Sequence, residues 1–370
     1  MNTKMKTFTI ILIFFSAYNA KAQVLTSFGF DTGIADSSFY KSIPVYNLTD
    51  ALHHPESTLA VTLGSKDSNL AEVKNLVHLE YLYFDETFFV SSVNLKKQKT
   101  EALFNVLSSL GSIKFVSIHD TNLLPYIRKI KSLKGLRCNT FDNTLFNSLK
   151  TDFSNLELLI INDPAAEVVN VSGLNYLKQL EIYSMYMATV DESVCELLTL
   201  KALRMKPGKL TALPKNFSRL KNLSYFSLTG TTFFKGFPYP VLSLTNLQTL
   251  ELDLLAVKSI PPGLADFKSL RKLIFNEARK ISELPVELKR LPVLTMIEIR
   301  DAGDLEDVSV LLEFEHPFSI LLSRCNYLKI AKQLATSAML KNMFVSKSIY
   351  YKDLEKLKLL IPQNKLLLSE

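Results

Sequence analysis

The sequence contains no tryptophan, and only 11 of its 370 residues are glycine. So little glycine excludes a collagen-like chain, in which every third residue must be glycine. Hydrophobic residues make up 47% of the sequence, and this share excludes an intrinsically disordered chain. The apolar side chains are numerous enough to build a continuous hydrophobic core.

Cysteine is also scarce, because the chain has only Cys138, Cys195 and Cys325. An odd number of cysteines at long separations fits neither a disulfide framework nor a metal site. Cys138 occupies a position that is apolar in the internal repeats of the chain, which predicts a buried free thiol. Burial is also favoured for Cys195 and Cys325, with partial exposure left open.

Signatures of catalytic and cofactor sites are missing as well. The sequence has no glycine-rich phosphate loop, no zinc-protease motif and no Gly-x-Ser-x-Gly elbow. The adjacent His53 and His54 have no acidic or cysteine ligand at a matching spacing. We therefore expect no cofactor, no metal and no enzymatic activity, with a hydrolase that uses an unrecognised site as a remote alternative.

Residues 1–22 have the features of a secretory signal peptide. Lys4 and Lys6 form a basic start, residues 8–15 are an apolar run, and Ala20-Lys21-Ala22 is a small-x-small cleavage site before Gln23. The alternative is an uncleaved anchor, but about 20 apolar residues are needed to cross a bilayer. We expect an exported protein without membrane insertion after cleavage, in the periplasm, at the cell surface or secreted.

The charge of the chain gives no sign of nucleic-acid binding. Removal of the signal peptide deletes three lysines and no acidic residue, so the formal net charge falls from +7 to +4 (7 − 3). The remaining excess of basic residues is spread among many acidic ones, whereas nucleic-acid binding needs a clustered basic stripe. We therefore expect no nucleic-acid partner.

One apolar spacing recurs ten times along the chain. Each copy has an apolar residue, two other residues, an apolar residue, two others, an apolar residue, one other and an apolar residue, as in Leu244, Leu247, Leu250 and Leu252. The copies begin at Leu76, Leu110, Ile130, Phe153, Leu174, Leu197, Leu220, Leu244, Phe267 and Leu291. Apart from the first interval, successive copies begin 20 to 24 residues apart, which is within the range of leucine-rich repeats.

This spacing resembles that of exported bacterial leucine-rich-repeat proteins, from about Pro55 to Pro362. The resemblance implies an α/β solenoid with a curved parallel β-sheet on the concave side and turns and short helices on the convex side. We divide the chain into a signal peptide (1–22), an N-terminal segment and cap (23–54), leucine-rich repeats (55–302), and degenerate repeats with a C-terminal cap (303–370).

Several segments depart from the regular repeat. Residues 100–110 have helical spacing, with Thr100 placed to cap the helix, and residues 55–63 look like a degenerate first copy. Residues 353–361 predict a final helix, followed by a strand at residues 366–368 that closes the stack. The asparagine that many members of the family carry three residues after the strand is missing, so we expect irregular turns.

The side chains that flank the buried strand positions should point outward from the concave sheet, because strand side chains alternate between faces. Exposed tyrosine and arginine are enriched at binding hot spots. The candidate ligand-binding residues are Tyr81, Tyr83, Phe115, His119, Arg137, Tyr183, Arg204, Tyr225, Glu251, Asp253 and Arg300. The alternative is that they are ordinary sheet residues packed across strands.

The sequence thus favours a non-catalytic protein that binds a protein on its concave face, with a glycan as the less favoured ligand. The alternative from another class is a structural or scaffold role in the cell envelope. Alanine replacement of Tyr81 and Tyr83 together should weaken ligand binding with little change in thermal stability. The oligomeric state is left open.

Overall fold

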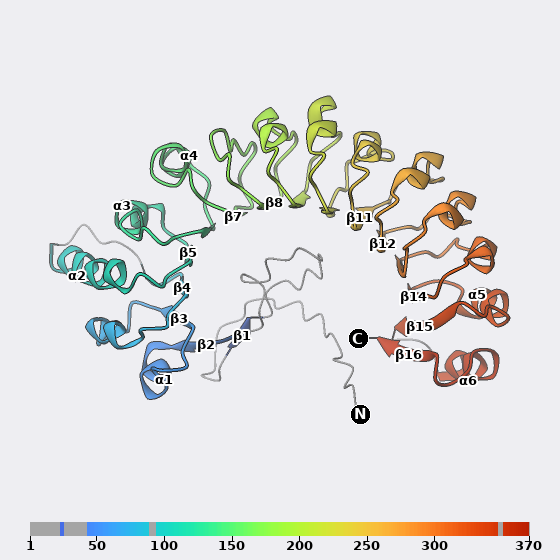
Figure 1. Ribbon diagram of the computed structural model, residues 1–370, viewed down its shortest axis with the longest axis horizontal. Coiled ribbons are helices and arrows are strands. Elements are labelled where there is room, and N and C mark those ends of the chain that lie inside the picture. The colour runs from blue at the N-terminus through green and yellow to red at the C-terminus, as the bar shows by residue number, and fades with distance from the viewer. Residues whose placement is uncertain (1–22, 26–42, 89–93, 347–350, 370) are drawn as a thin grey trace. The chain divides into compact units, whose positions relative to one another are not determined.

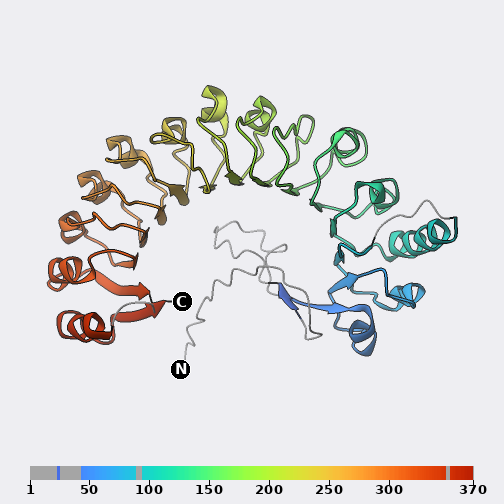
Figure 2. The same cartoon turned by 180° about the vertical axis from the view of Figure 1, so that it is seen from behind.

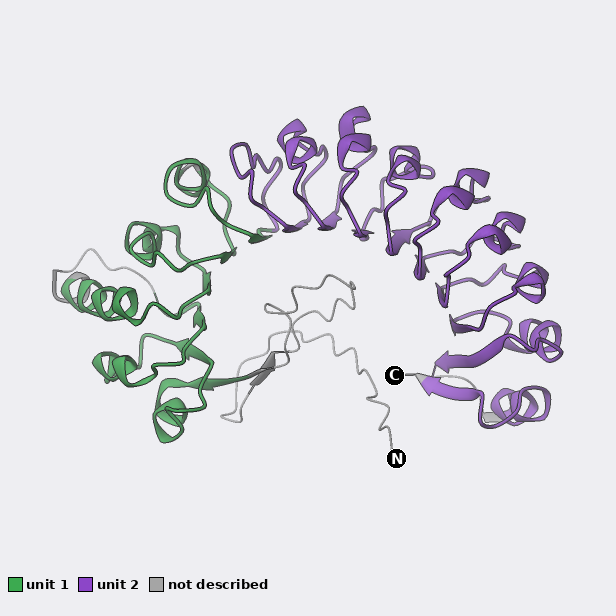
Figure 3. Ribbon diagram, viewed as in Figure 1, with its two compact units in different colours: residues 1–163 green, residues 164–370 purple. Residues whose placement is uncertain are grey.

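The computed structural model describes residues 23–25, 43–88, 94–346 and 351–369. The predicted signal peptide lies outside these ranges. The chain forms two compact units, residues 1–163 and 164–370, which we call unit 1 and unit 2 (Figure 3). Within the described ranges, no helix combines the length and the apolar character that a membrane span requires.

Unit 1 alternates strands with helices and short 3-10 helices, which are labelled η. Its strands are β1 (Gln23–Leu25), β2 (Ile43–Asn47), β3 (Ala60–Leu63), β4 (Tyr81–Phe84), β5 (Phe115–Ile118), β6 (Gly135–Cys138) and β7 (Leu158–Asn162). Its helices are α1 (Leu48–His53), η2 (Leu70–Asn75), α2 (Asn94–Leu110), η3 (Thr121–Leu123), α3 (Leu124–Ile127) and α4 (Asn143–Thr151).

Unit 2 continues the alternation with shorter helices. Its strands are β8 (Gln179–Ser184), β9 (Ala202–Pro207), β10 (Tyr225–Leu228), β11 (Thr249–Asp253), β12 (Lys272–Asn276), β13 (Met296–Arg300), β14 (Phe318–Ser323), β15 (Leu340–Ser346) and β16 (Leu366–Ser369). Its helices are η4 (Glu192–Glu196), η5 (Lys215–Arg219), η6 (Tyr239–Ser243), η7 (Pro262–Asp266), η8 (Val286–Arg290), η9 (Ser309–Glu313), α5 (Tyr327–Leu334) and α6 (Tyr351–Leu360).

Successive strands within each unit pair side by side and in parallel. In unit 1 this pairing runs from β2 to β7, and β1 adds to β2 in the antiparallel direction. In unit 2 it runs from β8 to β16. Figures 1 and 2 show that the strands of each unit line the inner side of its stack and the helices form the outer side. We call the strand-lined side the inner face.

The apolar positions of the ten copies form the core between these two layers. All of them are buried except Leu110 at the carboxyl end of α2, which is half-buried. In β11, for example, Leu250 and Leu252 are buried, and both lie in register with buried apolar residues of β10 and β12. Each buried aliphatic side chain contributes about 1.5 to 3 kcal/mol, so stacked copies stabilise one another.

Proline begins three of the outer helices of unit 2. Pro214, Pro261 and Pro285 precede η5, η7 and η8 in an extended conformation, and the apolar residue three positions later is buried in each case. Proline suits this place because its fixed φ fits the turn and no ladder hydrogen bond is required there. At these three places a leucine-proline or isoleucine-proline pair therefore marks the start of an outer helix.

Two expectations about the ends of the stack are confirmed. The degenerate copy at residues 55–63 contains β3, and the predicted closing helix and strand are α6 and β16. The parallel pairing also extends beyond the segment predicted as regular repeats, because β2 pairs with β3 and β13 pairs with β14. Residues 303–349, which keep only fragments of the spacing, thus still supply two strands of the stack.

The predicted cap of the helix at residues 100–110 is wrong. The helix α2 spans Asn94–Leu110, so Thr100 lies within it and does not cap its amino end. Leu103, Phe104 and Leu107 are its buried apolar residues within positions 98–110, Thr100 is buried as well, and Val106 is only half-buried. The helical spacing was visible only in the carboxyl half, because the preceding residues Lys96, Lys97, Gln98 and Lys99 carry no apolar period.

The three cysteines give a simple test of this core. Cys138 and Cys195 are 1% and 0% exposed, Cys325 is half-buried, and all three are free. Burial raises the pKa of each thiol, to about 12 for Cys195 and Cys325, so little thiolate is present at neutral pH. In the native protein a maleimide should label Cys325 slowly, and Cys138 and Cys195 only after unfolding, as peptide mass spectrometry would show. Rapid native labelling of Cys138 would contradict the core described above.

Candidate binding face

The inner-face side chains form columns, because parallel strands in register place equivalent residues side by side. We number the columns by position in the strand. In unit 1 the first column contains Tyr81, Phe115, Gly135 and Leu158, and the second contains Tyr83, Ser117, Arg137 and Ile160. The third contains His119 and Asn139, which follow the ends of β5 and β6, and Asn162, the last residue of β7. The candidate residues of unit 1 are therefore neighbours on one surface.

Three aromatic rings pack together on this surface. The ring of Phe115 lies 6.3 Å from that of Tyr81 and 5.7 Å from that of Tyr83, both tilted. We call these three residues the aromatic cluster. Gly135 leaves the space that Phe115 needs, since a Cβ at Gly135 would stand 2.7 Å from the Phe115 ring. Gly135 is the first residue of β6, and a glycine within a strand is a sequence signal for such a close approach.

The expectation that the candidate aromatics are exposed is wrong for three of them. Tyr81, Phe115 and Tyr225 are 6%, 5% and 4% exposed, and only Tyr83 and Tyr183 are half-buried. The reason is lateral packing, because each ring is covered by side chains of the adjacent strands as well as by its own sheet. Burial and, to a smaller extent, the charge of Glu80 raise the pKa of Tyr81 to about 12.

This packing changes the result expected from mutating the cluster. Replacing Phe115 with alanine should lower the free energy of unfolding by about 3 to 5 kcal/mol, because a buried ring is lost from between two others. Urea denaturation would measure the loss. The matched control is Phe233→Ala at a ring that is 55% exposed, where the change should be small. Equal losses in the two variants would contradict the packing of the cluster.

Arg137 stands beside the aromatic cluster without a partner of its own. Its side chain is half-buried, its Nε is buried without a hydrogen-bond partner, and no described residue forms a hydrogen bond or an ion pair with it. Burial raises the pKa of Tyr83, and the nearby charge of Arg137 opposes part of that rise. Burial lowers the pKa of His119, and Arg137 lowers it further, while Glu86 and Asp85 oppose the change.

In unit 2 the inner face is a chain of polar side chains that satisfy one another. Glu181, 2% exposed, accepts hydrogen bonds from Gln179 Nε2 and the Tyr183 hydroxyl, both at 2.7 Å. Arg204 Nη2 donates to the Tyr225 hydroxyl at 2.7 Å. That hydroxyl in turn donates to Glu251, which also accepts from Ser227 and Asn276. We call this group the polar network.

The polar network extends to β13 through Asn276. Arg300 donates from Nη1 to the side-chain oxygen of Asn276 at 3.3 Å and from Nη2 to Glu298 at 2.5 Å. Glu298 is 3% exposed and also pairs with Lys272 at 2.6 Å. Asp253 accepts from the backbone N–H of Gly230 in the turn after β10. Each carboxylate of the network thus has its donors within the stack.

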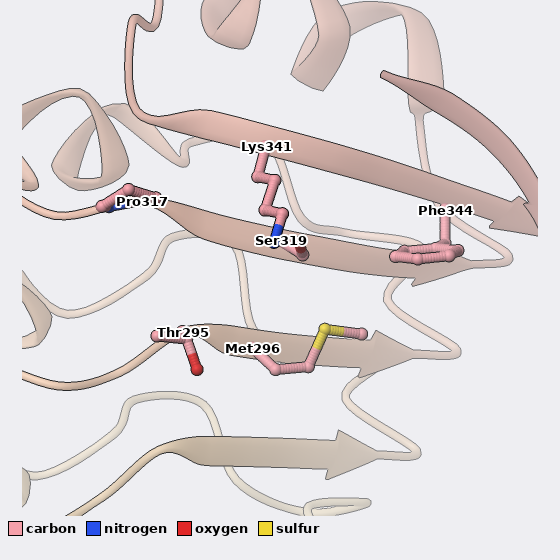
Figure 4. Close-up of a pocket in the computed structure, with 6 residues that line it drawn as sticks. All are labelled: Thr295, Met296, Pro317, Ser319, Lys341 and Phe344. Atoms are coloured by element: carbon pink, nitrogen blue, oxygen red, sulfur yellow. The ribbon is translucent and has the colours of Figure 1, made fainter. Parts of the chain in front are cut away.

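A shallow hollow lies on β13 to β15 of unit 2. Its volume is about 460 Å³. The lining residues are Thr295, Met296, Pro317, Ser319, Lys341 and Phe344. Figure 4 shows the Lys341 side chain extending toward Ser319, with the Met296 and Phe344 side chains farther along the strands. None of these was a candidate residue. Four of the six lie beyond residue 302, where the repeat spacing could not be followed, and Thr295 and Met296 are neither aromatic nor charged.

Comparison with known proteins supports the fold. No family model matches the sequence, and no curated protein matches it. Among solved structures, an internalin (inlF) from Listeria monocytogenes aligns with 92% of each chain at 17% identity and a TM-score of 0.51. The fold is that of a leucine-rich-repeat protein. A leucine-rich-repeat protein of Leptospira interrogans aligns with 87% of this chain and 99% of its own, at 17% identity and a TM-score of 0.41. The leucine-rich-repeat domain of the type III effector XopL aligns with 87% and 93%, at 13% identity and 0.40.

The leucine-rich-repeat frame divides the candidate residues into two sets. Tyr81, Tyr83, Phe115, His119 and Arg137 are brought together on unit 1. Tyr183, Arg204, Tyr225, Glu251, Asp253 and Arg300 lie on unit 2. In the second set the side chains mainly form hydrogen bonds within the polar network. Sequence reasoning missed Glu181 and Glu298 as their buried acidic partners.

The missing asparagine ladder is replaced by other side chains. Asp163 accepts a hydrogen bond from the backbone N–H of Phe141 at 2.8 Å, and Ser184 Oγ accepts from the backbone N–H groups of Tyr186 and Met187. Asp85 accepts from the backbone of Thr87 and Phe88. Different residues therefore satisfy the turns of different repeats, in agreement with the irregular turns that the sequence predicts.

The polar network should make the stability of the protein depend on acid pH through Glu251. Burial alone would raise the pKa of Glu251, but Arg204, Ser227, Asn276 and Arg300 outweigh it and lower the pKa below its usual value of 4.5. A carboxyl with a lowered folded-state pKa stabilises the fold above the unfolded pKa, and this contribution is lost as the pH falls through the folded pKa. Urea unfolding at pH 7, 5, 4 and 3 should show Glu251→Gln to be less stable at pH 7 and less sensitive to acid. Parallel pH profiles would contradict this role.

Proposed function

We propose that this leucine-rich-repeat protein is an exported, non-catalytic binding protein that holds a protein ligand on its inner face. A glycan is the less favoured ligand. The observation that carries the proposal is that inner-face aromatic, arginine and acidic side chains other than Arg137 are held by their neighbours before any ligand binds. Side chains that are already ordered lose little conformational entropy on binding, so such a surface is suited to recognition.

The composition of this surface favours a protein as the ligand. Tyrosine and arginine combine a large contact area with directional hydrogen bonds, and they dominate hot spots between proteins. The half-buried Tyr83 and Tyr183 and the cation of Arg137 provide such groups on the strands. The enzymatic alternative finds less support, because a nucleophilic cysteine must reach the thiolate form, whereas burial raises the pKa of all three thiols.

The proposal is tested by photo-crosslinking from two lysines of one repeat. Lys206 is exposed on β9 at the inner face, and Lys215 is exposed on η5 at the outer side. A photo-crosslinking residue replaces each lysine in the chain of residues 23–370, and both variants are incubated with envelope and surface protein fractions of the source organism. We expect a saturable crosslinked product from position 206 that excess unlabelled chain suppresses, and none from position 215.

The alternative function gives the opposite pattern. A structural or scaffold protein that binds through its outer side would crosslink specifically from position 215 and not from position 206. That result would overturn the proposal, as would suppression of crosslinking by envelope polysaccharide alone, which would make the ligand a glycan. Matched melting temperatures of the two variants would show that both are folded.

Export is a separate part of the proposal. The basic start, the apolar run of residues 8–15 and the small residues at positions 20 and 22 support removal of residues 1–22. Cell fractionation followed by mass spectrometry should find the protein outside the cytoplasm with Gln23 as its first residue. A cytoplasmic protein that retains residues 1–22 would contradict export without affecting the binding face.

A further inference from the structure

The inner face carries three candidate arginines, and only two of them interact with acidic side chains of the stack. Arg300 donates to Glu298 and Asn276. Arg204 donates to Tyr225, and the charges of Glu181 and Glu251 act on it. Arg137 has neither a hydrogen bond nor an ion pair to any part of the chain that the structure describes. A desolvated donor without an acceptor costs free energy, so its place on the ligand-facing side calls for an explanation.

Carboxylates that flank β4 and β7 in unit 1 are engaged with other groups. Glu80 pairs with Lys114 at 2.7 Å, and Glu157 pairs with Lys134 at 3.3 Å. Asp85 accepts three hydrogen bonds from Thr87 and Phe88. The counter-charge for Arg137 therefore does not come from these acidic residues of unit 1.

The side of Arg137 toward β7 is apolar, and the side toward β5 carries only the small buried hydroxyl of Ser117. In its column the neighbours are the buried Ser117 on one side and the half-buried Ile160 on the other. Tyr83, in contact with Phe115, stands beyond Ser117. Leu158 and Ile160 pack with the aromatic cluster as one apolar group. A cation is thus placed beside a small apolar surface.

Such a surface matches a specific pair of ligand side chains. A guanidinium binds a carboxylate through two parallel hydrogen bonds, and this pairing is strong where water is excluded. Because the Nε of Arg137 is already buried, part of its desolvation cost is met before the ligand arrives. The apolar side chains around it offer contact area for an aromatic or a large aliphatic residue next to the acid.

We propose that Arg137 pairs with an aspartate or glutamate side chain of the protein ligand, whose neighbouring aromatic or large aliphatic residue packs on Tyr83, Phe115 and Ile160. This inference rests on the proposed function, because it requires a protein ligand on the inner face. It names what that ligand presents: an acidic residue flanked by an apolar one in an exposed segment.

The experiment uses a displayed library of random twelve-residue peptides, selected on the chain of residues 23–370. Selection is repeated on Arg137→Met, which keeps a long side chain without its charge. It is also repeated on Arg137→Lys, which keeps the charge but not the two parallel N–H donors of the guanidinium. Arg128→Met is the matched control. Arg128 is exposed at the end of α3, and its replacement removes the same charge from unit 1. Equal melting temperatures establish that the variants are folded.

We expect peptides selected on the native chain to share an acidic residue beside an aromatic or large aliphatic one. Their affinity should fall about 10- to 30-fold in Arg137→Met, as for a binding hot spot, less in Arg137→Lys, and not measurably in Arg128→Met. Replacing the acidic residue of a selected peptide with its amide should cause a similar loss on the native chain and little further loss on Arg137→Met.

Two results would overturn the inference. One is a selection without any acidic preference or without enrichment; the other is an affinity that Arg137→Met leaves unchanged. The crosslink from position 206 separates this failure from failure of the proposed function. If a native partner still crosslinks there in Arg137→Met with undiminished affinity, the inner face binds a protein and the role of Arg137 is wrong. If position 206 captures no partner, the proposed function itself fails.

Discussion

Replacing Leu250 with arginine is expected to abolish the cooperative folding of unit 2. Leu250 is 0% exposed, and in register it lies between Phe226 of β10 and Leu273 of β12, which are also 0% exposed. A buried charge without a partner costs several kcal/mol, and whole domains are stable by only about 5 to 15 kcal/mol. Loss of one repeat also removes the interface that stabilises each neighbouring repeat.

Far-UV circular dichroism and urea denaturation would measure this loss. The control is Leu198→Arg, because Leu198 is 49% exposed in the turn after η4 and the substitution is chemically the same. The control should change the free energy of unfolding by no more than about 0.5 kcal/mol. A Leu250→Arg variant with native stability would show that the register of the repeats is wrong.

The second large effect is expected at Arg204. Replacing it with methionine keeps a long apolar stem but removes the cation that faces the carboxylates of Glu181 and Glu251 and the hydroxyl of Tyr225. Breaking a buried charge pair by removing one partner costs about 3 to 5 kcal/mol, because the other charge stays buried. The free energy of unfolding should fall by about that amount at pH 7.

Arg137→Met is the matched comparison for Arg204→Met. Both arginines occupy the second inner-face column of their units, but Arg137 pairs with no described carboxylate. Its replacement should leave the free energy of unfolding within about 1 kcal/mol of the native value, since no buried partner is left unsatisfied. Equal destabilisation by the two variants, measured by urea titration, would refute the distinction between a structural and a ligand-facing arginine.

The repeat of the sequence was enough to predict the fold, since both of its periods have a direct structural meaning. The spacing of about 23 residues sets the stacking of one strand on the next, and the alternation within Leu250 and Leu252 identifies the buried face of the strand. These features depend only on residues close in the chain. They remain valid from β4 to β13, in every copy that the spacing marks.

The burial of individual inner-face residues could not be predicted in the same way. Whether Tyr81 is covered depends on Phe115, and the room for Phe115 depends on Gly135, one repeat farther on. Likewise, the partners of Arg204 and Glu251 follow from the pairing of β9, β10 and β11, and not from any motif within one strand. Sequence alone showed which side chains face inward, but not which of them pack together.

The carboxyl-terminal repeats were hidden for a different reason. The outer elements there are the helices α5 and α6, of eight and ten residues, in place of the five-residue 3-10 helices of the preceding repeats. In addition, the pairing of β14 with β15 shifts between Phe318 and Ser319. Both changes alter the distance between apolar residues, so the spacing is lost although the stack continues.

The side chains of the polar network of unit 2 differ from repeat to repeat, whereas the apolar core positions are equivalent. Apolar positions repeat every 23 or 24 residues here, so a strand could pair with the strand of the wrong repeat and still align its leucines. The side chains of the inner face oppose such a wrong pairing. Without the repeat of β11, Tyr225, Ser227 and Asn276 would all lose the carboxylate of Glu251 as their acceptor. The polar network thus favours the pairing of each strand with its own neighbours, and penalises stacks that skip a repeat during folding.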